Sequence, residues 1–319
     1  MRPVTLIISN SIDYVADLLV THLGSENVFR YNTDLWRDYT LSVTGSTIEI
    51  SDPTGRSVTD ADIAKVYRRS SMRASTIFPQ MQLSDLERYA EEEVYAAWSD
   101  LFNIFWEQGK IILSQPLSTQ RSGKLQQLRL APKYFEITPF RFLLNRQDQM
   151  CPGKASVCKS FNFKYADGIG FYSTKVDEGD LDPAQPWFLT DFIEATHDVT
   201  VAVVRDVLFA FELERAAFID ETIDWRQSPT KHAHRGWKRT QLPDTLQSGI
   251  FSFMADVGQH FARLDFLRKD GRYIFLEANY NGEWGWLDPD NTEGLMAKII
   301  YEIDPRTPVA SCPRPIWRS

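Results

Sequence analysis

Two carboxylates and an amide stand close together in the C-terminal part of the chain, in a pattern suited to binding a metal ion. Asp265 lies among apolar residues, and Glu277 and Asn279 follow a second apolar run. Lys269-Asp270-Gly271 separates the two runs and predicts the tight turn of a β-hairpin. Side chains alternate along a strand, so Glu277 and Asn279 point to one side, and strand pairing can bring Asp265 opposite them.

Three oxygen-bearing side chains at one point need a partner, because carboxylates are rarely buried alone. A hard cation such as Mg²⁺ prefers oxygen ligands of this kind. The alternative is that Asp265 and Glu277 are solvated residues on the open face of a sheet. Spacing by itself leaves both interpretations open.

The residues that precede the hairpin predict the elements that must position it. Val4 to Ile8 is a short apolar run typical of a strand, and a helical pattern follows as far as Leu23. Together with a strand at Lys65 to Arg69, this predicts a small α/β lobe. Leu83 to Gln108 carries aromatic residues at helical spacing, which predicts a helix packed on the core. We expect the first lobe to end near Gln115-Pro116.

Composition narrows the class of protein. A chain of 319 residues is long enough for a large core or for two to three lobes. The net charge of −8 argues against a general nucleic-acid or membrane-surface binder. The three cysteines, Cys151, Cys158 and Cys312, form no C-x-x-C pair and fit a reducing cytoplasm. The opening apolar run is too short for a signal peptide, and no run reaches transmembrane length, so we expect a cytoplasmic protein without a membrane partner.

The hairpin pattern D-F…FLEANYNGEW resembles the closing segment of ATP-grasp ligases, in which an Asp, a Glu and an Asn hold Mg²⁺ against the phosphates of ATP. The continuation Gly282-Glu283-Trp284 is similar to that of the ATP-grasp maturases of ribosomal peptides, the group containing the microviridin macrocyclases. The resemblance implies an α/β (α+β) ATP-grasp fold. It implies an N-terminal pre-ATP-grasp α/β domain at 1–116, a central subdomain at 117–190 and a C-terminal subdomain at 191–319 that contains the metal site. The implied metal ligands are Asp265, Glu277 and Asn279.

The same resemblance implies a nucleotide site. GKLQQLRLA matches a family helix whose lysine, here Lys124, reaches the phosphates, although a helix lysine is otherwise only solvated. Lys159, in the apolar strand ASVCKSF, matches a lysine on the α-phosphate and needs an anionic partner or a route to water. The remaining implied nucleotide contacts are a hinge at Thr190, Asp191 and Ile193 and a ribose contact at Asp198. Two residues depart from the family pattern: Thr190 replaces a glutamine or glutamate, and Thr200 replaces an arginine frequent in the peptide-modifying branch.

Three arginines complete the implied site. The segment VYRR resembles a strand of the maturases whose arginines, here Arg68 and Arg69, lie near the active cleft and bind substrate. A strand that ends in solvated arginines explains the same residues. Asp224-Trp225-Arg226 resembles a D-W-R element, and Arg226 would stabilise charge on a transferring phosphoryl group.

A carboxylate becomes an acyl donor when ATP converts it to an acyl phosphate, a step that gathers anions and needs Mg²⁺ and cations. We therefore expect an ATP-grasp ligase that uses ATP and Mg²⁺, releases ADP and phosphate, and joins a side-chain carboxylate to a hydroxyl or amine of a precursor peptide made of leader and core. Catalysis is assigned to Arg226, Lys159 and Asn279, and the resemblance suggests a homodimer. The alternatives are a ligase for small amino acids and a non-catalytic nucleotide-binding scaffold. The pattern leaves the peptide, the ring size and the choice of ester or amide undetermined.

Overall fold

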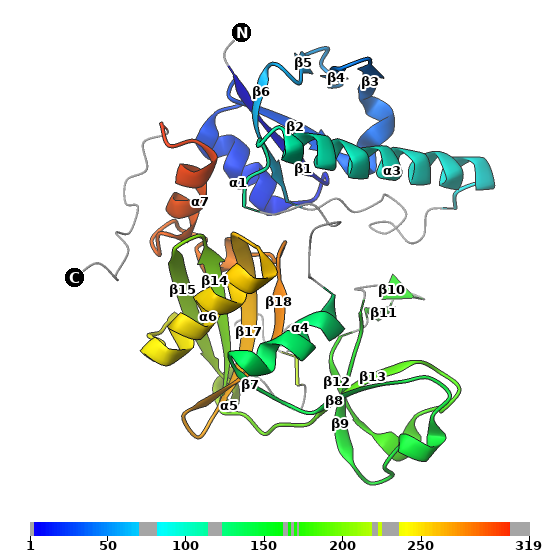
Figure 1. Ribbon diagram of the computed structural model, residues 1–319, viewed down its shortest axis with the longest axis vertical. Coiled ribbons are helices and arrows are strands. Elements are labelled where there is room, and N and C mark those ends of the chain that lie inside the picture. Colours follow the sequence, from blue (N-terminus) through cyan, green and yellow to red (C-terminus); the bar gives the residue numbers. More distant parts are fainter. Residues whose placement is uncertain are drawn as a thin grey trace.

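The computed structural model describes residues 3–69, 82–113, 123–161, 165–166, 169–170, 172–218, 223–224 and 236–306. Its strands gather into several sheets that occupy different parts of the molecule (Figure 1). The N-terminal part is built on three parallel strands in the order β2-β1-β6. These are β1 (Val4–Ser9), β2 (Val28–Asn32) and β6 (Ile63–Arg68), and α1 (Tyr14–Leu23) connects the first two. Every residue of β1 is buried, as expected for a central parallel strand covered on both faces.

A small antiparallel sheet and a long helix complete the N-terminal part. The small sheet contains β3 (Thr40–Thr44), β4 (Thr47–Ser51) and β5 (Ser57–Thr59). Helix α3 (Asp85–Glu107) begins with a capping box between Ser84 and Glu87, in which each side chain bonds the main chain of the other residue. Its buried aromatic stripe packs with the apolar residues of β1 and β2, so the predicted helix and its core face are confirmed.

The middle of the chain forms a four-stranded antiparallel sheet in the order β12-β9-β13-β8. Its strands are β8 (Phe140–Leu143), β9 (Ala155–Lys159), β12 (Thr174–Asp177) and β13 (Trp187–Asp191). A separate two-stranded pair joins β10 (Tyr165–Ala166) to β11 (Ile169–Gly170). Short 3₁₀ helices complete the described connections: η1 (Thr33–Asp38), η3 (Ala131–Lys133), η4 (Gln147–Gln149), η5 (Glu178–Asp180) and η8 (Gly285–Leu287).

The largest sheet has six strands in the order β16-β15-β14-β17-β18-β7. They are β7 (Glu136–Ile137), β14 (His197–Val204), β15 (Val207–Glu214), β16 (Lys238–Arg239), β17 (Phe261–Lys269) and β18 (Arg272–Asn279). The predicted hairpin is confirmed: β17 and β18 meet at Asp270 and Gly271, both with positive φ, as a tight hairpin turn requires. Helix α6 (Asp244–Val257) covers one face, and α5 (Arg215–Phe218) follows β15.

Two elements from the segment predicted as the central subdomain reach this large sheet. Strand β7 pairs in parallel with β18, and α4 (Lys124–Leu130) lies against β18. Figure 1 shows α4 between the six-stranded and the four-stranded sheets. The domain limits at 116 and 190 stay predictions.

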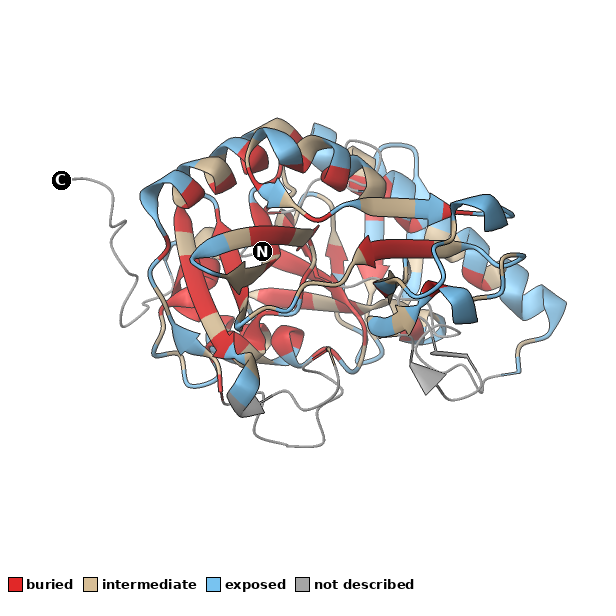
Figure 2. Ribbon diagram, turned by 90° about the horizontal axis from the view of Figure 1, so that it is seen from below, coloured by how far each residue is buried: buried red, intermediate tan, exposed pale blue. Residues whose placement is uncertain are grey.

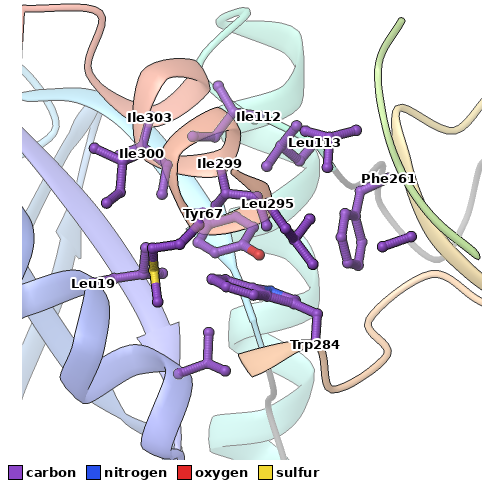
Figure 3. Packing of buried hydrophobic residues seen from close by; sticks show 14 of the residues in the cluster. Leu19, Tyr67, Ile112, Leu113, Phe261, Trp284, Leu295, Ile299, Ile300 and Ile303 are labelled. Atoms are coloured by element: carbon purple, nitrogen blue, oxygen red, sulfur yellow. The ribbon is translucent and has the colours of Figure 1, made fainter. Parts of the chain in front are cut away.

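The opposite face of the large sheet is partly covered by the N-terminal part of the chain. Helix α7 (Leu295–Ile303) packs against α1 and β14, and its apolar residues join one cluster with Leu19, Tyr67 and Phe261 (Figure 3). Trp284 lies in the middle of this cluster and is fully buried. The buried strands run through the interior between helices with exposed outer faces (Figure 2). Among the described residues, no helix is long and apolar enough to cross a membrane.

Candidate functional site

The hairpin brings Asp265, Glu277 and Asn279 to one place. Asp265 on β17 is the register partner of Glu277 on β18. The Asn279 amide nitrogen lies 3.1 Å from Glu277 Oε1 and 3.3 Å from Asp265 Oδ2. The predicted convergence of these side chains is therefore present, on the face of the sheet away from α6.

A β-bulge makes this convergence compatible with the apolar core. Phe266 pairs with Phe275, whereas its neighbour Asp265 pairs with Glu277, so Leu276 is an extra residue on β18. In a regular strand Phe275 and Glu277 would point to the same face. Here Phe275 is buried in the apolar cluster, and both Leu276 and Glu277 line a cavity on the other side.

Arg263 is a site residue that the motif analysis missed. Its guanidinium lies 3.2 Å and 3.1 Å from the two carboxylate oxygens of Asp265, a bidentate contact, and it is nearly buried. Thr200, from β14, donates a 2.7 Å hydrogen bond to Asp265 Oδ1. The signal was present in the sequence: Arg263 stands two residues before Asp265 in a strand, so the two side chains share a face.

Lys124 comes from α4 and supplies a positive charge to the hairpin. Its ammonium lies 3.1 Å from Glu277 Oε2 and donates a 2.7 Å hydrogen bond to the carbonyl of Ser160. Burial alone would raise the pKa of Glu277, but the charges of Lys124 and Lys159 outweigh it and lower that pKa to about 2. Glu277 is thus held as a carboxylate at neutral pH.

Lys159, at the end of β9, lines the same cavity from the four-stranded sheet. Burial lowers the pKa of its ammonium, and the nearby charge of Lys124 lowers it further against the opposing effect of Glu277. Two lysines, one from helix α4 and one from strand β9, therefore share the carboxylate of Glu277. An additional anion, such as a phosphate, would relieve their mutual repulsion.

The predicted hinge residues line the cavity where β13 leaves the four-stranded sheet. Thr190 is buried and pairs in register with Phe140 and Val157, so its main chain belongs to the sheet. Asp191 forms a 2.6 Å ion pair with Lys154, and Ile193 follows on the connection to β14.

Asp198 lines the cavity on the same face as Thr200, and Arg215 lies 2.7 Å from its Oδ2. Burial raises the pKa of Asp198 to about 7, against the opposing effect of Arg215. A carboxyl group that titrates near neutrality can accept hydrogen bonds from hydroxyl groups, as the predicted ribose contact requires.

The two arginines at the end of β6 have different surroundings. Arg69 lines the cavity but is nearly buried: it donates a 2.7 Å hydrogen bond to the Asn281 carbonyl and forms an ion pair with Glu283. Arg68 is not among the cavity-lining residues that the structure describes, and its guanidinium lies 4.8 Å above the ring of Phe102.

One cavity of about 1510 Å³ is lined by most of these residues: Arg69, Lys124, Lys159, Thr190, Asp191, Ile193, Asp198, Arg263, Asp265, Glu277 and Asn279. Two carboxylates and an amide at hydrogen-bond distance form a donor set that fits a hard cation, whose other ligands would be water or phosphate oxygens. Within the described ranges no group of three or more His, Cys, Asp or Glu side chains is arranged to hold a metal ion. The predicted catalytic residue Arg226 lies outside the described residues.

Comparison with solved structures identifies the fold. A ribosomal-peptide-associated ATP-grasp ligase from Chryseobacterium gregarium, solved with ADP and a leader and core peptide, is similar over 97% of this chain and 98% of its own, with a TM-score of 0.76 and 21% identity. The macrocyclase MdnC from Microcystis aeruginosa MRC, bound to the precursor peptide MdnA, is similar over 94% of this chain and 98% of its own, with a TM-score of 0.74 and 19% identity. A D-alanine–D-alanine ligase from Bacillus anthracis in complex with ATP covers 96% of both chains, with a TM-score of 0.55 and 11% identity.

No family model matches the chain, and no curated protein sequence matches it. The structural similarity nevertheless spans nearly the whole chain. The chain has the ATP-grasp fold, as the sequence predicted.

Proposed function

We propose that this chain is an ATP-dependent carboxylate ligase that acts on a ribosomal precursor peptide. It would activate a side-chain carboxylate as an acyl phosphate and join it to a hydroxyl or amine of the same peptide. The observation that carries the proposal is the meeting of Asp265, Glu277, Asn279 and Lys124 in one cavity, within an ATP-grasp fold. The peptides in the two structures of highest similarity quoted above support the choice of substrate.

The proposed reaction has two steps. A carboxylate oxygen of the peptide attacks the γ-phosphorus of ATP, the bond between that phosphorus and the β–γ bridging oxygen breaks, and ADP leaves. The hydroxyl or amine then attacks the acyl carbon, the carbon–oxygen bond to phosphate breaks, and the acceptor's proton passes to solvent. Neither step needs a covalent enzyme nucleophile.

The protein's task is to hold anions together. Lys124 and Lys159 would bind phosphate oxygens, and Arg263 and Arg226 would face the charge that develops on the transferred phosphoryl group. Asp265, Glu277 and Asn279 would hold Mg²⁺, which when bound neutralises and orients the phosphates. Thr190, Asp191 and Ile193 would place the adenine, Asp198 would bind the ribose, and Arg68 and Arg69 are proposed to act on the peptide side.

The test replaces Glu277 by Gln in the purified full chain. We expect loss of peptide-dependent ADP release, because the neutral amide removes a metal ligand and the anionic partner of Lys124. Glu107→Gln, an exposed carboxylate at the end of α3, is the matched control and should keep full activity. Retained turnover in Glu277→Gln, with an intact fold by circular dichroism, would remove the metal assignment.

A ligase that joins small amino acids is the second candidate, because the D-alanine–D-alanine ligase shares the fold over nearly the whole chain. Mass spectrometry separates the two: a precursor peptide loses one water for each cross-link, whereas a dipeptide ligase releases ADP with free amino acids alone. ATP that binds but is never hydrolysed with either substrate would indicate a scaffold. The resemblance further suggests a cytoplasmic homodimer, and light scattering of the purified chain tests the dimer.

A further inference from the structure

The side chain of Gln127 makes an unusual contact with the metal-site strand. Its Nε2 donates a 2.8 Å hydrogen bond to the carbonyl of Ala278, and its Oε1 accepts a 2.9 Å hydrogen bond from the N–H of the same residue. Both residues are buried, at 3% and 4% exposure. One amide side chain therefore satisfies both main-chain groups of Ala278.

The edge of β18 explains why this contact is needed. Strand β7 pairs with β18 only at Ile274 and Phe275, and its two residues end there. The main-chain groups of Ala278 lie farther along the same strand and are shielded from water. An unpaired buried N–H or C=O is unfavourable, and Gln127 takes the place of the missing neighbouring strand.

The contact also joins two parts of the candidate site. Ala278 lies between Glu277 and Asn279, two of the proposed metal ligands. The position of its peptide groups therefore fixes the backbone from which both side chains project. Gln127 lies three residues after Lys124 on α4, and residues at this spacing share a helix face. The amide thus sets the position of the lysine relative to the carboxylate that it contacts at 3.1 Å.

We propose that Gln127 is a positioning residue that holds the phosphate-binding lysine and the metal-binding strand in register. This inference rests on the proposed function, because it assigns Gln127 a role in that same site. Gln127 acts on the proposed metal ligands through its two hydrogen bonds to Ala278 and on Lys124 through α4. Groups that orient metal ligands in this way change metal affinity or activity by about 10–100-fold when removed.

The experiment compares four variants of the full chain. Gln127→Met keeps the length and removes both hydrogen bonds, whereas Gln127→Glu keeps the acceptor but cannot donate until it is protonated. Gln126→Met is the exposed control one position earlier. Leu128→Ala is the packing control, because Leu128 anchors the same helix in the apolar cluster without bonding Ala278.

Two measurements report on positioning without turnover. Calorimetry gives the affinity for ADP with and without Mg²⁺, and hydrogen exchange gives the protection of the Ala278 amide in the nucleotide-free protein. For Gln127→Met we expect the Mg²⁺-dependent gain in ADP affinity to fall by about 10–100-fold and the Ala278 amide to exchange faster. For Gln127→Glu we expect the deficit relative to wild type to shrink as pH falls from about 8 to about 6, because a buried carboxyl group is protonated more readily.

The outcomes separate the two proposals. A wild-type chain that shows no Mg²⁺-dependent ADP binding would overturn the proposed function and this inference with it. Normal wild-type binding combined with an unchanged Mg²⁺-dependent gain in Gln127→Met would overturn this inference alone. This inference alone would also be overturned if Leu128→Ala, at an equal loss of melting temperature, weakened the Mg²⁺-dependent gain in ADP affinity as much as Gln127→Met does.

Discussion

The two faces of the six-stranded sheet are made by alternate residues of the same strands, and they have opposite character. Toward α6 the strands present Val199, Val201 and Leu264, all buried in one apolar cluster. On the other face their immediate neighbours are Asp198 and Asp265, which line the cavity, and Thr200, which bonds Asp265. The apolar face contributes most to stability through the area it buries. The polar face brings together charged groups, which would be costly to bury without partners.

The comparison shows where a sheet can accommodate a charged site. Along β14 the cavity face begins with Asp198 and Thr200 and continues with Ala202 and Val204, which pack in the cluster that contains α7. The polar residues thus occupy only the part of the face that α7 and Trp284 leave uncovered. The covered part packs against α7 and the N-terminal part of the chain, while the open part borders the cavity.

The largest expected effect comes from the metal-binding carboxylate on β17. Asp265→Asn keeps the size of the side chain but removes its charge, and it leaves Arg263 and Thr200 without an anionic partner. We expect peptide-dependent ADP release to fall by about 10³-fold, measured by a coupled ADP assay. Asp290→Asn is the exposed control. A loss smaller than about tenfold would contradict the assignment of this face as the catalytic one.

Arg263 is expected to have the next largest effect. Arg263→Lys keeps the positive charge but loses the bidentate contact with Asp265, so kcat should fall by about 10²-fold with a smaller change in the KM for ATP. Steady-state kinetics with the peptide measures both constants. Arg272→Lys, in an exposed ion pair with Glu136, should change neither constant. Equal behaviour of the two variants would exclude Arg263 from the reaction.

A change on the apolar face should affect stability instead of chemistry. Phe253, on α6, is fully buried against this face and contacts the rings of Phe135 and Phe275. Phe253→Ala should lower the free energy of unfolding by about 3–5 kcal/mol, measured by urea denaturation. The folded fraction of this variant should still bind Mg²⁺ and ADP. Loss of ligand binding at full stability would show that the two faces do not divide their roles in this way.

The smallest expected effect is the pH dependence of stability that comes from Asp198, at one end of the cavity face. Burial raises the pKa of Asp198 from 3.8 to about 7, so between these values the folded chain binds more protons than the unfolded chain. The contribution of this group to stability is complete below pH 3.8 and is lost as pH rises to about 7, at up to about 1.4 kcal/mol per pH unit. Asp198→Asn should flatten this decline in the nucleotide-free protein, as thermal melts between pH 5 and 8 would show. A wild-type profile that rises over that range would contradict the shift.

Much of the hairpin could be predicted from local sequence. Asp270-Gly271 specifies the turn, and strand alternation places Glu277 beside Asn279 because both rules act within a few residues. The resemblance located Lys124, Lys159 and the hinge, and the structure brings all of them to the same cavity. It places the Arg68 guanidinium over Phe102, outside the cavity-lining residues described.

By itself the sequence determined the hairpin, the apolar strands and the set of oxygen-bearing side chains, because turn chemistry and side-chain alternation are local. Only the tertiary structure decided that Leu276 is a bulge, that Thr200 of β14 bonds Asp265 of β17, and that Gln127 completes the free edge of β18. Each of these depends on which segment packs beside which, and for Gln127 and Ala278 that means a contact across 151 residues of chain. Such pairings follow from the burial of the whole sheet, so no local pattern contains them.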